Sequence, residues 1–548
     1  MLKVFSALLI LAIMTATTAL AIITETSETT TWTGNAQNQN WHDPNNWSHG
    51  VPNAHTDAII PGGQASYPVI GADAAVNNLT LEDGAYLIDN GNLSINGTFT
   101  MKRGDLTIPH DWRMISAPVT GKTIVGSDFV PTTDNWGEAG NRTFDFYAFN
   151  ETIPRADGSN MPPWINIRLA GETVNPSFET EFQKGKGYLV AYNDSYPGTT
   201  FHFNGTMNTG DVTVPLTYSE NAHPDDRGWN LVGNPYPSGY LWDGAAYDDL
   251  ESDFAYIYFP EHMQFGHYSF IESGTIPPNQ GFFVRAAEGG GSLTFLDANR
   301  VNAGIFFKKH GLADEGQHEP EESIVLAFGA GERTDRATIR IVEGSSFDSD
   351  RRDAFKLFSL SQSMPQIYTI ADDNERLAVN SIPDVTEEVR IPAGLRVTET
   401  GSYFITAIEI TGRFATMNVF LFDQETGTEV RLSEDCRYDF VANESDNDHD
   451  NPRFEIRFQM TGEPTRTHPF AKPTARIYCH ENILSVVFSH TDSPQRLLEV
   501  YDLYGRLLVR HQLEHGTTIR KHLNLAPGIY LVRVEDHNGS LTERIIVK

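Results

Sequence analysis

The segment WNLVGNPYP at residues 229–237 matches the segment WRMISAPV at residues 112–119. In each segment a tryptophan is followed two residues later by an apolar side chain, Leu231 or Met114, at the spacing of one face of a β-strand. Each tryptophan is therefore predicted to anchor a hydrophobic core. The competing interpretation is a platform on which a sugar ring stacks.

Three further blocks keep the same order in both halves of this region. They are YAFNE from residue 147 with IYFPE from 257, FQKGKGYLVAY from 182 with IPPNQGFFVRA from 276, and TFHF ending at 203 with LTFL around 295. A preserved order over four blocks predicts two copies of one β-module, residues 111–210 and 211–310, with an insertion in the first.

Residues 22–110 are rich in Asn, Gly and Thr, and their short apolar runs are separated by glycines. Leu79 and Phe99 are 20 residues apart, as are Tyr86 and Leu106. This recurrence favours the rungs of a short parallel β-helix. A β-sandwich remains the alternative.

Residues 320–460 alternate apolar and polar side chains at 338–341 and at 454–458, and turn residues lie between the runs. This pattern predicts an antiparallel β-sandwich. Prolines and a glycine interrupt residues 461–475, which are predicted to be a linker before a last domain at 476–548. The expected fold is thus an all-β, multidomain chain.

The first 21 residues have the pattern of a secretory signal peptide. Lys3 is followed by an apolar run over residues 4–14 and by Ala19-Leu20-Ala21, which predicts cleavage after Ala21. The apolar run is too short to span a bilayer, which requires about 20 residues. No other segment reaches that length, so the mature chain is expected to lack a transmembrane span.

Charge divides the chain into two parts. The net charge of −32 would repel phosphate backbones, which excludes nucleic acid as a partner. Residues 467–548 hold 10 Lys and Arg and 8 Asp and Glu, whereas residues 22–466 hold 29 and 64, so the two net charges are +2 and −35. The tail is therefore expected to be a separate module.

The tail contains three characteristic blocks. The first is VYDLYGRLL from residue 500, with Tyr501, Tyr504 and Gly505. The second is LNLAPGIYLVRVE from residue 523, and the third is RIIVK, which ends the chain at Lys548. Glycine at 505 suits a tight hairpin turn, and Pro527-Gly528 suits a turn before the next strand.

These blocks resemble the type A C-terminal sorting domain of the Bacteroidetes type IX secretion system. The residues that match its pattern, and that we take as the sorting signal, are Tyr501, Tyr504, Gly505, Pro527, Gly528, Tyr530 and Lys548. The resemblance implies a seven-stranded, immunoglobulin-like sandwich that interacts with the secretion machinery. It also implies removal of the domain by a sortase-like protease and export through the periplasm to the outer cell surface.

The sequence contains no recognisable catalytic motif, and no cofactor is expected. Gly121-Lys122-Thr123 resembles the end of a phosphate-binding loop, but Ser116 stands where its first glycine belongs. One acidic loop places Asp446, Asp448 and Asp450 at alternate positions, a pattern that presents oxygen ligands to Ca²⁺. A weak calcium site is the hypothesis for this loop, and a solvated acidic turn is its alternative.

Two functions remain open from the sequence. The first is a non-catalytic adhesin or structural protein that binds host protein or matrix. The second is a glycan-binding or glycan-degrading surface protein that uses exposed aromatic side chains. Burial of the tryptophans would favour the first, and a shared groove would favour the second. The tryptophans that decide between them are Trp32, Trp41, Trp47, Trp136, Trp164 and Trp242.

Overall fold

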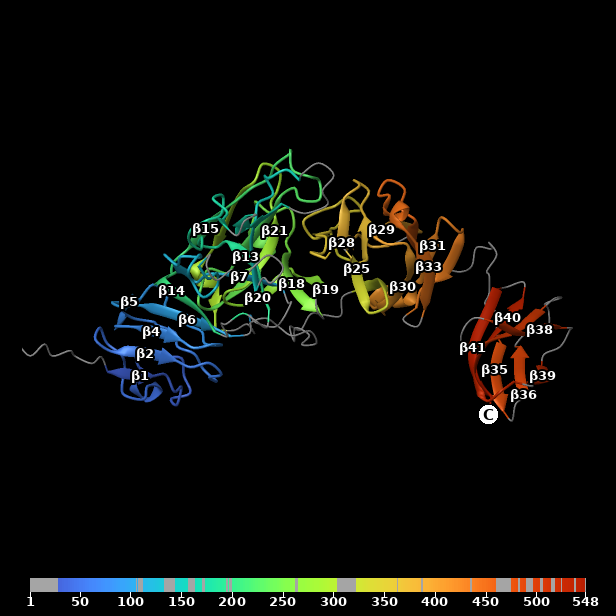
Figure 1. Cartoon of the computed structure of the whole chain (residues 1–548), viewed down its shortest axis with the longest axis horizontal. Helices are drawn as coiled ribbons and strands as arrows, with labels where there is room; N and C mark the ends of the chain where they lie inside the picture. Colours follow the sequence, from blue (N-terminus) through green and yellow to red (C-terminus); the bar gives the residue numbers. More distant parts are fainter. Residues whose placement is uncertain are drawn as a thin grey trace, which may run out of the picture. The chain divides into compact units, whose positions relative to one another are not determined.

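A computed structural model of the chain shows two compact units, one ending at Met460 and the other beginning at Thr461 (Figure 1). The structure describes residues 28–104, 106, 112–132, 143–155, 163–169, 173–193, 196, 200–261, 265–302, 322–361, 363–385, 388–433, 436–459, 475–480, 483–488, 496–502, 506–513, 518–523, 525–536 and 539–547. The predicted signal peptide lies outside the described residues. No helix within the described ranges is long and apolar enough to cross a membrane.

The N-terminal region has the parallel pairing of a β-helix. Strands β1 (Thr29–Thr31), β2 (Asp57–Ile60), β4 (Leu79–Leu81) and β6 (Phe99–Arg103) lie side by side, and β3 (Ala74–Val76) pairs with β5 (Leu93–Ile95), all parallel. Leu79 lies opposite Phe99, one predicted rung further along the chain. An antiparallel sandwich would not give this register, so of the two alternatives the structure has the β-helix-like one.

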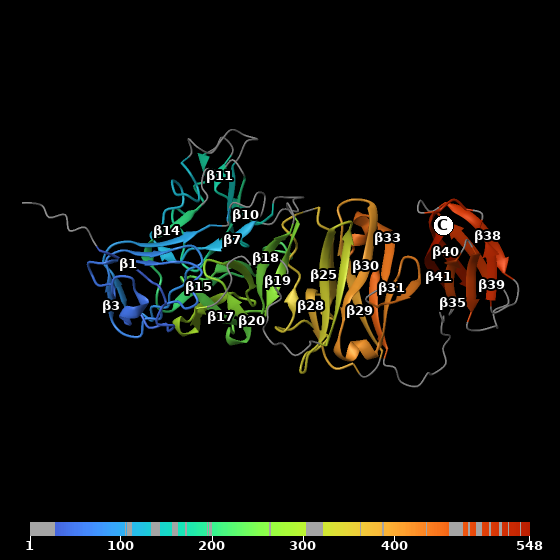
Figure 2. The same cartoon turned by 90° about the horizontal axis from the view of Figure 1, so that it is seen from below.

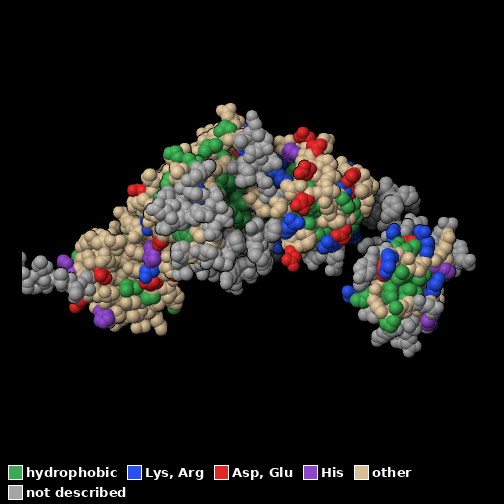
Figure 3. Space-filling model, viewed as in Figure 1, with side chains coloured by type: hydrophobic (Ala, Val, Ile, Leu, Met, Phe, Trp, Pro, Cys, Tyr) green, Lys and Arg blue, Asp and Glu red, His purple; other side chains and the backbone are tan. Residues whose placement is uncertain are grey.

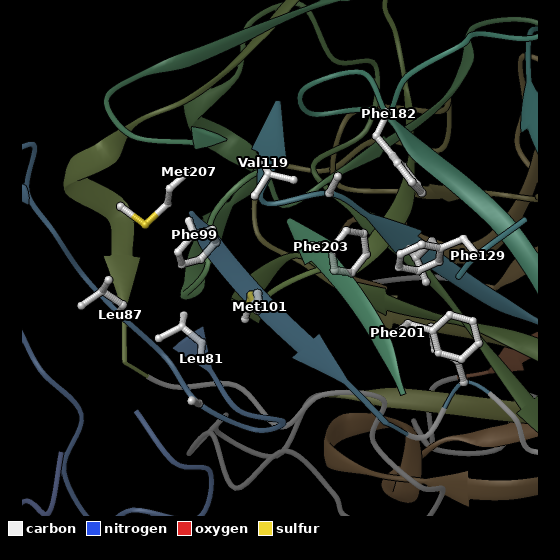
Figure 4. Close-up of a cluster of buried hydrophobic side chains, with 14 of the residues drawn as sticks. Leu81, Leu87, Phe99, Met101, Val119, Phe129, Phe182, Phe201, Phe203 and Met207 are labelled. Atoms are coloured by element: carbon white, nitrogen blue, oxygen red, sulfur yellow. The ribbon is translucent and has the colours of Figure 1, made fainter. Parts of the chain in front are cut away.

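The first module continues this sheet and shares its core. Strand β14 (Phe201–Met207) pairs with β6 and with β8 (Val119–Thr120). Figure 4 shows the buried side chains that join the two regions. They include Leu81, Phe99 and Met101 from the N-terminal region and Phe129, Phe182 and Phe203 from the module. The N-terminal region and the first module therefore fold as one body.

Each module contains a four-stranded sheet with the same strand order. In the first, β10 (Trp164–Asn166), β9 (Phe144–Phe149), β13 (Gly187–Tyr192) and β7 (Arg113–Ser116) are neighbours in that order. In the second, the corresponding order is β19 (Phe265–Ile271), β18 (Ala255–Glu261), β21 (Gly281–Arg285) and β16 (Trp229–Gly233). Leu189 of β13 and Phe283 of β21 are equivalent positions in the two modules. Tyr147 lies opposite Leu189 and Tyr256 lies opposite Phe283, so Tyr147 is equivalent to Tyr256. The sequence comparison aligned Tyr147 with Ile257, so that part of the alignment is wrong by one residue.

The two modules meet at equivalent glycines. A Cβ atom on Gly187 would lie 2.5 Å from the carbonyl oxygen of Val232, and one on Gly281 would lie 3.0 Å from that of Ile115. Isolated bridges join Lys186 to Val232 and Ile115 to Gln280 in the same reciprocal way. A Cβ atom at residue 187 would clash with the facing backbone and one at residue 281 would crowd it, so glycine favours this close approach from both sides.

Smaller strands and short 3-10 helices complete this region. The remaining pairs are β11 (Arg168–Leu169) with β12 (Thr173–Val174), β15 (Val212–Leu216) with β22 (Gly291–Phe295), and β17 (Gly239–Asp243) with β20 (Ser273–Ile276) and β23 (Arg300–Val301). Among the described residues of the first unit, the 3-10 helices are η1 (Pro44–Asn46), η3 (Gly244–Ala246), η4 (Asp297–Asn299), η5 (Gly412–Thr416) and η6 (Glu444–Asn447).

Residues 323–459 form one continuous sheet that curls around its own core, rather than two separate sheets (Figure 2). Its strands are β32 (Thr428–Arg431), β31 (Asn418–Asp423), β34 (Phe454–Gln459), β29 (Val389–Arg396), β27 (Gln366–Ile370), β28 (Arg376–Ile382), β25 (Arg333–Ile341), β24 (Ser323–Ala330), β30 (Gly401–Ile410) and β33 (Arg437–Ala442), with β26 (Ala354–Phe355) beside β28. The pair β25 and β28 is parallel, and the other pairs are antiparallel. We call this part the barrel-like domain.

The second unit is a small sandwich of two antiparallel sheets. One contains β35 (Ala475–His480), β36 (Ile483–Phe488) and β39 (Thr518–His522). The other contains β38 (Leu507–Leu513), β37 (Arg496–Tyr501), β40 (Gly528–Asp536) and β41 (Gly539–Val547). Its core includes Leu484, Val500 and Val532. The described strands number seven, as the resemblance implies.

Candidate functional site

In the predicted calcium loop, the carboxylates of Asp446 and Asp448 already bind other groups of the protein. The Asp446 carboxylate accepts a hydrogen bond from the Asn443 amide at 2.8 Å and forms an ion pair with Arg453 at 3.1 Å. Asp448 accepts hydrogen bonds from the amides of Asp450 and Asn451. No three acidic, histidine or cysteine side chains in the described residues are placed to hold a metal ion. Calcium binding here stays a prediction.

Gly121-Lys122-Thr123 borders an open cavity of about 560 Å³, next to β8 and β14. Lys122 donates a hydrogen bond from Nζ to Asn204 Oδ1 at 2.7 Å and lies 3.4 Å from Asp128. Asp128 also contacts the Nδ1 atom of His202 at 2.7 Å. The charge of Lys122 is thus balanced by a carboxylate, which is unlike a phosphate-binding loop. The Asp128–His202 contact joins residues 74 apart, and no sequence motif indicated it.

Most of the tryptophans that were to decide between the two functions lie in cores. Trp32, Trp41, Trp47 and Trp242 are buried. Trp164 is half-buried and packs against Phe149 and Phe283, and Trp136 lies outside the described residues. Most of the described tryptophans of this set are therefore core side chains rather than the lining of a shared groove.

Tyr501 lies on the outer face of the sorting sheet, because its neighbour Val500 points into the core. Its hydroxyl donates to Glu499 Oε2 at 2.7 Å, and this hydrogen bond raises the pKa of Tyr501. Glu499 also pairs with Arg510 at 2.9 Å and is itself buried. The Glu499 carboxylate thus lies beneath the side chains of Tyr501 and Arg510 on the outer face of the domain.

Tyr530, in contrast to Tyr501, points into the core and stabilises the fold of the sorting domain. Its ring is buried, and its hydroxyl donates to the carbonyl of Ala526 at 2.8 Å. This bond closes the turn at Ala526 and Pro527, directly before β40 begins at Gly528, as a tyrosine corner does in immunoglobulin-like sandwiches. Tyr504, Gly505 and Lys548 lie outside the described residues, so their part in the sorting signal stays a prediction.

Comparison with known families gives two matches. Residues 74–264 and 242–458 match the family described as domain of unknown function (DUF8693), and together they cover more than half of the chain. The chain belongs to this family. Residues 480–548 match the family described as secretion system C-terminal sorting domain. No curated protein matches the sequence.

The sorting domain makes this DUF8693 protein a type IX secretion cargo, exported to the cell surface or beyond. It also implies contact with the secretion machinery. The two DUF8693 matches overlap over residues 242–264 and do not coincide with the two predicted modules. The family match therefore leaves the duplication as a hypothesis and assigns no activity.

Proposed function

We propose that the exported chain is a non-catalytic surface protein. Contacts between its domains restrict their relative movement, so that they present a binding surface in a fixed orientation. The observation that carries this proposal is a set of ionic and polar contacts, each with at least one buried partner, that join the N-terminal region, the second module and the barrel-like domain. Interdomain movement is the usual expectation for multidomain chains unless the interface is extensive. Contacts of this kind oppose such movement, which suits a protein that holds a binding surface in a fixed orientation.

The first junction joins the N-terminal region to the second module. Arg300 of β23 contacts Asp89 at 2.5 Å and the carbonyl of Leu87 at 2.9 Å. Arg103 of β6 donates to the side chain of Asn279 at 2.7 Å. Both guanidinium groups are buried, so each depends on these partners for its hydrogen bonds.

The second junction joins the modules to the barrel-like domain. Asp225 contacts Arg376 of β28 and lies 2.7 Å from Arg396 of β29. Burial alone would raise the pKa of Asp225, but these two arginines lower it to about 2. Arg351 contacts Asp253 at 2.6 Å and extends this junction.

Binding without turnover is the expected behaviour of the released cargo. The cargo carries a net charge of −35, which favours basic partners such as matrix proteins. We would immobilise it, probe it with matrix proteins and glycans at low and high salt, and analyse each bound ligand for chemical change. Salt-sensitive binding of an unchanged ligand is expected. Conversion of the ligand to product would overturn the proposal.

A glycan is the second candidate ligand, because three half-buried aromatic side chains are neighbours on the first module. The ring of Tyr147 lies 5.8 Å from that of Trp112 and 6.4 Å from that of Trp164. Exposed aromatic faces stack on sugar rings. A glycan-array signal that disappears in Trp164→Ala would favour this candidate over a protein ligand.

We also infer that the two modules are copies of one ancestral unit. The identical strand order and the reciprocal contacts of Gly187 and Gly281 support this inference. Expressed separately, each copy should be unstable, because each would expose the backbone surface that its partner covers. A first module that is fully stable alone would argue against an obligate pair.

A further inference from the structure

A lysine, an asparagine and an aspartate meet in the first module, beside β8 and β14. The Nζ atom of Lys122 lies 2.7 Å from Oδ1 of Asn204 and 3.4 Å from Oδ1 of Asp128. Lys122 and Asn204 are 82 positions apart in the chain. The Lys122 side chain is only 10% exposed, so it is held in the fold rather than extended into water. An amine, a primary amide and a carboxylate thus share one site.

The backbone pairing of β8 with β14 brings the lysine and the asparagine together. Thr120 lies opposite Thr206, and the partner of each later residue lies one position earlier on an antiparallel strand, so residue 122 comes opposite residue 204. A Cβ atom on Gly205 would lie 2.4 Å from the carbonyl oxygen of Thr120. Glycine at this position therefore lets the two segments approach each other closely.

The carboxylate of the group is held in place by His202. Its Oδ2 atom accepts a hydrogen bond from the His202 amide at 2.6 Å and contacts the Nδ1 atom of the His202 ring at 2.7 Å. These contacts leave Oδ1 of Asp128 directed at Lys122. Figure 3 shows His, basic and acidic side chains close together on the surface near β6 and β14. The buried rings of Phe129 and Phe203, 4.6 Å apart, belong to the core of the same two segments.

The lysine nitrogen is close to the carbon of the asparagine amide. Cγ is one carbonyl bond from Oδ1, about 1.2 Å, so Nζ lies within about 3.9 Å of Cγ. Reacting atoms in a near-attack arrangement are about 3–3.5 Å apart, which a small rotation of the lysine side chain provides. Groups fixed in this way react as if each were present at about 10⁵ M or more. An amide, which is a poor electrophile, requires such an advantage.

We propose that Lys122 and Asn204 form an intramolecular isopeptide bond, with Asp128 as the catalytic carboxylate. The Lys122 ammonium gives a proton to Asp128, and the neutral amine attacks Cγ of Asn204 to form a new C–N bond. Asp128 passes its proton to the amide nitrogen of Asn204, the carbonyl re-forms, and the old C–N bond breaks. The new amide nitrogen releases its extra proton through Asp128 to the departing ammonia. Ammonium leaves, and the Asp128 carboxylate is restored.

The bond ties the segment after β8 to β14, the strand that also pairs with β6 of the N-terminal region. Hydrogen bonds between strands open when the strands are pulled apart, whereas an amide bond does not. The cross-link therefore keeps this part of the first module closed when a surface protein is under load. It is independent of which ligand the exported chain binds.

The test is mass spectrometry of the purified full chain, intact and after digestion with trypsin. The wild type should be lighter than its expressed sequence by one molecule of ammonia. Trypsin should fail to cut after Lys122, and a branched peptide should contain Lys122 joined to Asn204. Lys122→Arg and Asn204→Ala should each have the full mass of their own sequences. Asp128→Asn should slow bond formation by about 100-fold or more, followed as the linked fraction over time.

Lys102→Arg is the matched control, because Lys102 lies on the neighbouring strand β6 and contacts the carboxylate of Glu82 rather than an amide. It should keep the cross-link. The Asn204–Gly205 sequence offers a second route to the same loss of mass, since the Gly205 amide nitrogen can attack the asparagine side chain. Loss of ammonia that persists in Lys122→Arg would show that route and overturn the proposal. A wild type of full mass, with the two peptides recovered unlinked, would overturn it whether or not the variants fold.

Discussion

Arg300 and Asp89 form an ion pair in which the two side chains are 0% and 1% exposed. The two residues lie 211 positions apart in the chain, Asp89 in the N-terminal region and Arg300 in the second module. Asp89 also accepts a hydrogen bond from the Thr209 hydroxyl at 2.6 Å, and Arg300 donates to the Leu87 carbonyl. The pair therefore lies at the centre of a buried polar network that joins the N-terminal region to the second module.

Arg300→Met should destabilise the first unit by about 3–5 kcal/mol, because it leaves Asp89 buried without its cation. The measurement is urea unfolding of the cargo, followed by tryptophan fluorescence. Arg390→Met is the matched control, since Arg390 and its partner Glu388 are 55% and 45% exposed. It should cost less than about 1 kcal/mol. Equal losses for the two variants would refute the buried-junction account.

Acid should weaken the junction at Asp225 in a defined pH window. Its folded pKa of about 2 lies below the reference value of 3.8, so the charged form stabilises the fold above pH 3.8. That contribution, about 2 kcal/mol, is lost as pH falls through 2. Asp225→Asn should be less stable at neutral pH and should lose less stability between pH 4 and pH 2. Chemical denaturation at a series of pH values measures both effects, and a parallel loss in variant and wild type would contradict them.

The sorting domain should be dispensable for folding and essential for delivery. A chain that ends at Arg466 should accumulate in the periplasm as folded cargo, since the two units are separately compact. Cell fractionation with surface protease treatment measures the outcome. Delivery of the truncated chain to the surface would show that the export signal lies elsewhere.

Substitutions in the acidic loop should distinguish calcium binding from a structural ion pair between Asp446 and Arg453. If Asp446 serves Arg453, Asp446→Asn should lower the melting temperature without calcium, and Asp448→Asn should have a smaller effect. If the loop binds Ca²⁺, calcium should raise the melting temperature of the wild type and not that of Asp448→Asn or Asp450→Asn. Thermal unfolding with calcium and with chelator distinguishes these results.

Much of the candidate sorting site was predictable, since Tyr501 and Tyr530 both fall in motifs that the sequence displays. Their different roles were not predictable. Alternation along β37 and β40 indicates opposite faces, but the contacts with Glu499 and Ala526 depend on how the two sheets pack. Strands β35 and β39 show no clear apolar alternation in the sequence, because Arg, Lys and His interrupt it.

The sequence by itself determined the all-β class, the 20-residue recurrence in the N-terminal region and the identity of the sorting tail, because local period and turn residues carry that information. It left a β-helix and a sandwich open for the N-terminal region, and the parallel strand pairing decided between them. Only the tertiary structure decided which charges are buried and which residues meet. Asp89 and Arg300, Asp128 and His202, and Asp225 and Arg396 are far apart in the chain, and no local pattern links them. Their contacts arise when modules pack and water is excluded, since a charge removed from water must find a partner wherever the fold provides one.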